Sequence, residues 1–116
     1  MTEVLRASRA FDSKTLFRMM NGKCEKLRDA KNETVDISGY AYINIADIDG
    51  DDKAILYFEF TDGRIYATNS PTVMRTFDSM VSAFGEPSPE TPFCGVVIKE
   101  AKSRNGRNFL DIDFID

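Results

Sequence analysis

Histidine and tryptophan are absent from this chain of 116 residues, and cysteine occurs only twice. Without histidine, the chain cannot form the Ser-His-Asp or Cys-His systems of common hydrolases or any His-ligated zinc site. It also has no run of about 18 apolar residues that could cross a membrane, and its first residues lack the apolar stretch of a signal peptide. These absences predict a cytoplasmic protein that is not a hydrolase.

The two cysteines, Cys24 and Cys94, lie far apart in the sequence and form no CxxC pair. Free cysteine is among the most frequently buried residue types, and thiols stay reduced in the cytoplasm. We therefore expect two reduced, mostly buried thiols.

The chain also lacks an excess of basic residues, because 15 Lys and Arg face 19 Asp and Glu, for a net charge of −4. An overall positive charge, the simplest sign of nucleic-acid binding, is therefore absent. The charges are unevenly distributed, however, and a local cluster can create a field of its own sign. Acidic residues gather within 47–52 and 111–116, whereas basic residues gather within 99–107.

What the chain does have is enough apolar sequence, 42%, to fill one core, at a length typical of one domain. We expect a single domain over 1–116 with a flexible N-terminus at 1–11. A short helix is predicted over 12–21, with Asp12 as its N-cap and Gly22 at its end.

A second, longer helix is predicted between Ser70 and Gly85. Ser70 can cap its first turn, Pro71 suits the first helical position, and Gly85 can end it. Its apolar residues recur at helical spacing and are expected to face the core. They are Val73, Phe77, Val81 and Phe84.

Strands are predicted where apolar and polar residues alternate. In the longest of them, apolar residues keep one parity from Val35 to Ile45, and Gly39 indicates a bend or bulge. The pairs Asp62-Gly63 and Asn105-Gly106 predict hairpin turns. The predicted strands span 34–48, 53–60, 64–69, 93–102 and 107–115.

The predicted order is three strands, a helix and two strands. A long first strand that contains a glycine and a helix between the third and fourth strands are typical of the OB-fold, a five-stranded Greek-key barrel. We therefore expect a mainly β protein with a five-stranded OB-fold barrel and a short N-terminal helix. The OB-fold commonly binds oligonucleotides or oligosaccharides.

All four tyrosines fall on the strand parity that is predicted to face solvent. Tyr40 and Tyr42 lie on the first strand, Tyr57 on the second and Tyr66 on the third. An exposed tyrosine ring can stack on a nucleic-acid base of any sequence. The alternative is purely structural, since tyrosine forms strands well and its hydroxyl favours a wet edge.

Basic residues accompany these aromatic residues and could neutralise phosphates. In OB-folds the loop between the last two strands often closes over the ligand, and here the hairpin over 103–107 carries two arginines and is followed by Phe109. The alternative is a solvent-exposed turn that binds no ligand, since such turns commonly carry two arginines as well. The candidate cations are Arg64, Lys99, Lys102, Arg104 and Arg107.

Metal and nucleotide motifs are incomplete. In an EF-hand loop beginning at Asp47, Asp52 and Phe58 would occupy the positions that require glycine and glutamate. Glu100-Ala101-Lys102 matches half of a metal-dependent nuclease motif, without the surrounding elements that such a fold needs. P-loop, GxGxxG and GxSxG patterns are absent. We expect no metal, no cofactor and no enzymatic activity.

The stretch from Ala54 to Val73, AILYFEFTDGRIYATNSPTV, joins an apolar strand, an Asp-Gly turn, a tyrosine-bearing strand and a Ser-x-Thr-Val helix start. It resembles the small single-stranded DNA-binding proteins of phi-twenty-nine-like phages, which replicate by protein-primed synthesis. The resemblance covers most of 11–116. It continues through Phe11-Asp12, Thr15-Leu16, Ser103, Gly106 and Phe109.

The resemblance implies an OB-like barrel that coats displaced single strands during replication, without sequence preference. It also implies base stacking by Tyr66, and by Tyr42 and Tyr57. The acidic turn over 47–52 departs from a DNA-facing loop and indicates a surface for protein contact instead.

The sequence thus predicts a cytoplasmic, non-enzymatic protein whose partner is single-stranded DNA, with replication proteins as further partners and with neither a membrane nor a small-molecule substrate. The four tyrosines would stack on bases and the five candidate cations would contact phosphates, and Phe109 is a further candidate nucleic-acid-binding residue. The alternative is an acidic OB-type module that binds a replication or host protein through Asp47–Asp52.

Overall fold

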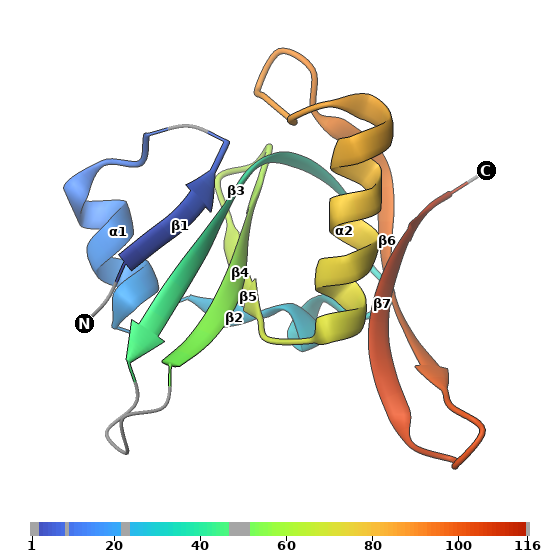
Figure 1. Cartoon of the computed structure of the whole chain (residues 1–116). Coiled ribbons are helices and arrows are strands. Elements are labelled where there is room, and N and C mark those ends of the chain that lie inside the picture. The colour runs from blue at the N-terminus through green and yellow to red at the C-terminus, as the bar shows by residue number, and fades with distance from the viewer. Residues whose placement is uncertain (1–2, 9, 22–23, 47–51, 116) are drawn as a thin grey trace.

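The computed structural model describes residues 3–8, 10–21, 24–46 and 52–115. The protein is mainly β, and one curled sheet in the form of a half-barrel wraps around a central helix (Figure 1). In chain order the elements are β1 (Glu3–Ala7), α1 (Ser13–Met20), β2 (Glu25–Lys26), the 3-10 helix η1 (Leu27–Ala30), β3 (Thr34–Ala46), β4 (Asp52–Phe60), β5 (Ile65–Thr68), α2 (Pro71–Phe84), β6 (Phe93–Lys102) and β7 (Asn108–Phe114).

Both predicted helices are present, with the predicted N-caps, whereas Gly22, the predicted end of the first helix, lies outside the described residues. The Asp12 carboxylate accepts a hydrogen bond from the Thr15 amide at 2.7 Å, and the Ser70 hydroxyl accepts one from the Val73 amide. α2 ends at Gly85, whose φ of +83° favours glycine. The predicted buried stripe of α2 is partly wrong, because Phe84 is 68% exposed at the last turn while Met80 is buried instead.

The sheet has the order β2-β5-β4-β3-β6-β7, and β1 pairs with β3. The five predicted strands lie at their predicted positions, and β1 and β2 are additional. The expected flexible N-terminus is wrong for Glu3–Ala7, which forms antiparallel pairs with β3. The physical reason is that part of one edge of β3 is left unpaired by β6. β6 pairs only with the first residues of β3, from Thr34 to Ile37, so β1 can bind the edge of β3 beyond them.

β3 changes the direction of its side chains at the predicted bulge. Its pairing with β4 shifts register between Ile37 and Gly39. Before the shift, Ile37 faces the interior; after it, Tyr40 faces the interior, and Ala41 belongs to a second cluster on the other face. One extra residue inverts the alternation, so the parity predicted from Val35 onward is wrong beyond Gly39.

The core therefore has two parts on opposite faces of the sheet. The inner part is centred on Phe77 of α2, whose ring lies 4.9 Å from that of Tyr40 and 4.8 Å from that of Phe58. The outer part lies between α1 and strands β3 and β4, where Met19 packs near Tyr57. Figure 1 shows α1 outside the sheet and α2 within its curve.

Both cysteines are free thiols, but the expected burial is wrong for Cys94, which is exposed at the start of β6. Cys24 is half-buried, and burial raises the pKa of its thiol. Among the described residues, no helix is long and apolar enough to cross a membrane.

Candidate nucleic-acid interface

Three of the four tyrosines are buried, so the prediction that they face solvent is wrong. The exposed fractions are 0% for Tyr40, 2% for Tyr57 and 7% for Tyr66. Tyr40 and Tyr66 are both cross-strand partners of Phe58, and side chains directly opposite each other on antiparallel strands share a face. Because Phe58 lies in the inner core, both tyrosines must lie there too.

Tyr57 has the predicted parity, opposite to that of Leu56 and Phe58, but α1 covers it. Its hydroxyl donates a hydrogen bond of 2.6 Å to the backbone carbonyl of Met19. Burial raises the pKa of Tyr57 to about 12. Tyr57 therefore anchors α1 to the sheet and offers no free ring face for a base.

This anchor predicts a pH-dependent stability. The neutral phenol is favoured in the folded state, so Tyr57 contributes stability that is complete below its ordinary pKa of 10 and is lost as the pH rises toward about 12. We expect Tyr57→Phe to lower the free energy of unfolding by about 1 kcal/mol at neutral pH, because the hydrogen bond is lost.

The difference between the wild type and Tyr57→Phe should shrink as the pH rises from 10 to about 12. Urea denaturation at a series of pH values measures it. A difference that stays constant over this range would contradict an ionisation linked to the Tyr57 anchor.

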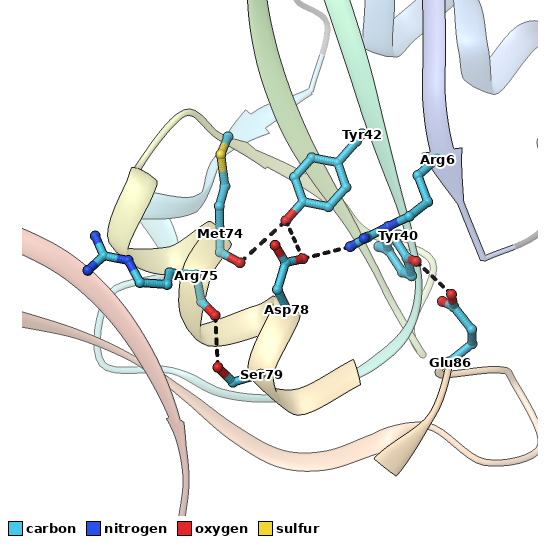
Figure 2. A network of polar contacts seen from close by, with 8 residues as sticks. All are labelled: Arg6, Tyr40, Tyr42, Met74, Arg75, Asp78, Ser79 and Glu86. Carbon is cyan, nitrogen blue, oxygen red and sulfur yellow. Dashed lines mark hydrogen bonds and ion pairs between the residues drawn. The ribbon is translucent and has the colours of Figure 1, made fainter. Parts of the chain in front are cut away.

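Tyr42 is half-buried and belongs to a polar network that joins β1 to α2 (Figure 2). Its hydroxyl donates to Asp78 at 3.0 Å, and Arg6 donates to the same carboxylate oxygen at 2.6 Å. The Arg6 guanidinium lies 4.8 Å from the centre of the Tyr42 ring and 5.3 Å from that of Tyr40. Burial, followed by the hydrogen bond to Asp78, raises the pKa of Tyr42.

Tyr40 completes the network, because its hydroxyl donates to Glu86 at 2.9 Å. Burial, then this hydrogen bond, raises the pKa of Tyr40 to about 12. The rings of Tyr40 and Tyr42 are engaged by Arg6 and by each other, with centroids 6.0 Å apart. Both tyrosines hold the N-terminal strand to the fold.

Two of the five predicted cations have carboxylate partners. Arg64 forms ion pairs with Asp62 at 2.7 Å and with Glu33 at 3.2 Å. Lys99 pairs with Asp113 at 3.3 Å. These pairs are exposed, and such pairs contribute little stability. They nevertheless reduce the local positive charge at both positions.

The other three predicted cations, Lys102, Arg104 and Arg107, lie together at the hairpin between β6 and β7, which projects from the body of the molecule (Figure 1). All three are exposed, and none of their side chains forms a hydrogen bond or ion pair with another described residue. The hairpin closes through the Ser103 amide, which donates to the Arg107 carbonyl at 2.9 Å. The predicted turn thus presents three cations for which the described residues offer no acidic partner.

A groove of about 600 Å³ lies between β5 and the start of β7, the strand that follows this hairpin. Lys26 and Arg28 contribute to one part of its wall, and Phe109, which is half-buried, contributes to another. None of the described residues that line the groove is acidic. The groove therefore combines two cations with one partly accessible aromatic ring.

The sequence does not indicate Lys26 and Arg28 as site residues, because residues 23–30 have no clear periodicity. In the structure, β2 pairs in parallel with β5 and leads into η1. This short pairing places Lys26 and Arg28 at the groove. Their nearness to Phe109 could not be read from the sequence, since more than eighty residues separate them along the chain.

No family model, no curated protein and no solved structure matches this chain. Within the described part of the chain, no three His, Cys, Asp or Glu side chains are grouped so as to hold a metal ion. Of the acidic turn, residues 47–51 lie outside the described residues.

Proposed function

We propose that this protein binds single-stranded DNA without sequence preference and catalyses no reaction. One observation carries the proposal: Lys102, Arg104 and Arg107 have no carboxylate partners among the described residues, and the strand that follows their hairpin brings Phe109 to a groove that Lys26 and Arg28 also line. The chain as a whole has a net charge of −4, so this local cluster of cations is a feature that binding of a polyanion would explain. A single strand also offers unpaired bases on which an aromatic ring can stack.

We further propose that the fold is a partly open OB-fold. The supporting observation is the strand order β5-β4-β3-β6-β7, with α2 between β5 and β6 in the chain. In an OB-fold the loop between the last two strands contacts the oligonucleotide. That loop would correspond to the hairpin between β6 and β7, where Lys102, Arg104 and Arg107 lie.

The chemistry of the groove favours a single strand over a duplex. Cations contact phosphates, which every sequence shares, and this contact weakens as salt rises. A phenyl ring stacks on any base that is free of its neighbours, a contact worth about 1–3 kcal/mol. Neither contact distinguishes one sequence from another. The role that we propose is to coat displaced strands during phage DNA replication, in line with the family resemblance of the sequence.

The alternative, an acidic module for protein binding, depends on Asp47–Asp52. Apart from the backbone of Asp52, this turn lies outside the described residues. No contact in the described residues favours this alternative, so we do not propose it.

A titration tests the proposed function directly. A fluorescent oligothymidylate of about 16 nucleotides, the upper range of OB-fold site sizes, would be titrated with protein while its anisotropy is measured. We expect binding at about 50 mM salt, weaker binding at about 300 mM salt, and poorer binding of a duplex of equal length. Equal binding of duplex and single strand, or no binding at low salt, would contradict the proposal.

A further inference from the structure

α1 occupies the face of the sheet on which an OB-fold would receive its ligand. In that fold the outer face of the second and third strands binds oligonucleotides, and here these strands would be β4 and β5. On this face, Met19 of α1 is fully buried near Tyr57 of β4, and side chains of β5 pack in the same cluster. A strand that crosses here would therefore meet the outer side of α1 and not the sheet.

The outer side of α1 carries an exposed aromatic ring between two cations. Phe17 is 61% exposed, so its ring is accessible to a ligand. Lys14 and Arg18 are four residues apart, and Phe17 lies three residues after Lys14, so all three side chains share one face of the helix. A hollow of about 720 Å³ is lined by these three residues and Ser13.

Within the part of the chain that the structure describes, the positive charges on this face have no carboxylate partner. α1 contains no acidic residue, and the side chains of Lys14 and Arg18 form no hydrogen bond or ion pair with another described residue. Asp12, just before the helix, is engaged as its N-cap. The face is therefore locally positive, although the whole chain is negative.

We propose that the outer face of α1 is a second contact for the same polynucleotide strand, with Phe17 stacked on a base and Lys14 and Arg18 on the phosphates beside it. This inference rests on the proposed function. Charge complementarity favours a polyanion over a second protein copy. A stable protein interface buries about 1,600 Å² with an apolar centre, whereas this face offers a single phenyl ring between two cations.

Two contacts on one strand make binding depend on length. A long strand that reaches both the groove and α1 gains affinity, because its second contact is intramolecular. A strand too short to span them gains nothing from α1. Length dependence is therefore a readout that a purely structural role of Phe17 would not produce.

The test compares the wild type with Phe17→Ala and with Phe17→Tyr, which keeps an aromatic ring. Binding would be measured for oligothymidylates of about 6 and about 16 nucleotides, within the range of OB-fold site sizes. We expect Phe17→Ala to bind the long strand about tenfold more weakly and the short strand unchanged, and Phe17→Tyr to restore the long-strand affinity. Circular dichroism would verify the fold, which an exposed side chain should not affect.

Each other outcome overturns the inference. If Phe17→Ala binds both lengths as tightly as the wild type, α1 makes no contact, while the proposed function stands. An equal loss at both lengths means that Phe17 acts within one short site. If the wild type forms an oligomer that Phe17→Ala disperses in sedimentation, the face binds a second copy. If the wild type binds neither strand, the proposed function fails together with this inference.

Discussion

Replacing Phe77 by alanine is expected to lower the free energy of unfolding by about 3–5 kcal/mol. Phe77 is fully buried where the inner face of the curled sheet meets α2. Its ring lies 4.9 Å from that of Tyr40, 4.8 Å from that of Phe58 and 5.8 Å from that of Phe93. Three strands thus pack on one side chain, and a cavity at this point cannot close without moving all of them.

Phe84 provides a matched control, because it is the same residue type on the same helix but is 68% exposed. Its ring touches Phe114 at a centroid distance of 5.5 Å, so Phe84→Ala should cost only about 1 kcal/mol. Urea denaturation of both variants measures the difference. Equal losses for Phe77→Ala and Phe84→Ala would mean that α2 does not present Phe77 to the sheet.

Removing the three hairpin cations together, as Lys102→Ala, Arg104→Ala and Arg107→Ala in one protein, is expected to weaken single-strand binding about 100-fold at low salt. Each charged contact to a phosphate is taken as worth about 1 kcal/mol or somewhat more. The slope of log affinity against log salt should also become shallower by about 2, since each phosphate contact on a single strand contributes about 0.7. Stability should hardly change, because these side chains bind no other described residue.

A pair of single substitutions separates a phosphate contact from a general charge effect. Lys102→Ala and Lys31→Ala remove the same side chain and the same charge, but Lys31 has Glu100 as a partner at 3.8 Å. We expect Lys102→Ala to reduce the salt slope by about 0.7 and Lys31→Ala to leave it unchanged. Equal effects of the two would indicate that net charge alone governs binding and that the hairpin is not a site.

Tyr66 shows where local patterning misleads. From Arg64 to Asn69, polar and apolar residues alternate in a way that predicts Ile65 and Ala67 inside and Tyr66 outside. In the structure the sheet has a core on both faces, because α1 covers the outer one. Alternation identifies the buried face only when the other face meets water. On a sheet covered on both faces, pairing with Phe58 decides the position of Tyr66.

In the candidate site, too, some residues could be predicted from the sequence and others only from the structure. The cations of the hairpin could be found from the sequence, since Asn105-Gly106 defines a turn and the residues around it must project. Phe109 was a candidate for the same reason. Lys26 and Arg28 were not, because β2 has two residues and only its pairing with distant β5 gives it a position. The outer face of α1 is a candidate contact only because the helix covers β4 and β5, and the sequence does not show which strands the helix covers.

The sequence by itself determined the local elements of this protein: the ends of α2 at Ser70 and Gly85, the cap at Asp12, the five strands and the β6–β7 hairpin. These features depend on side chains within a few residues of one another, through capping bonds, backbone preference and alternation. Only the tertiary structure decided which tyrosines are buried, that β1 pairs with the edge of β3, and that cations from β2 and η1 line one groove with Phe109 of β7. One residue inserted at the bulge of β3 inverts every side chain that follows, and contacts between distant segments then settle which face each cluster occupies.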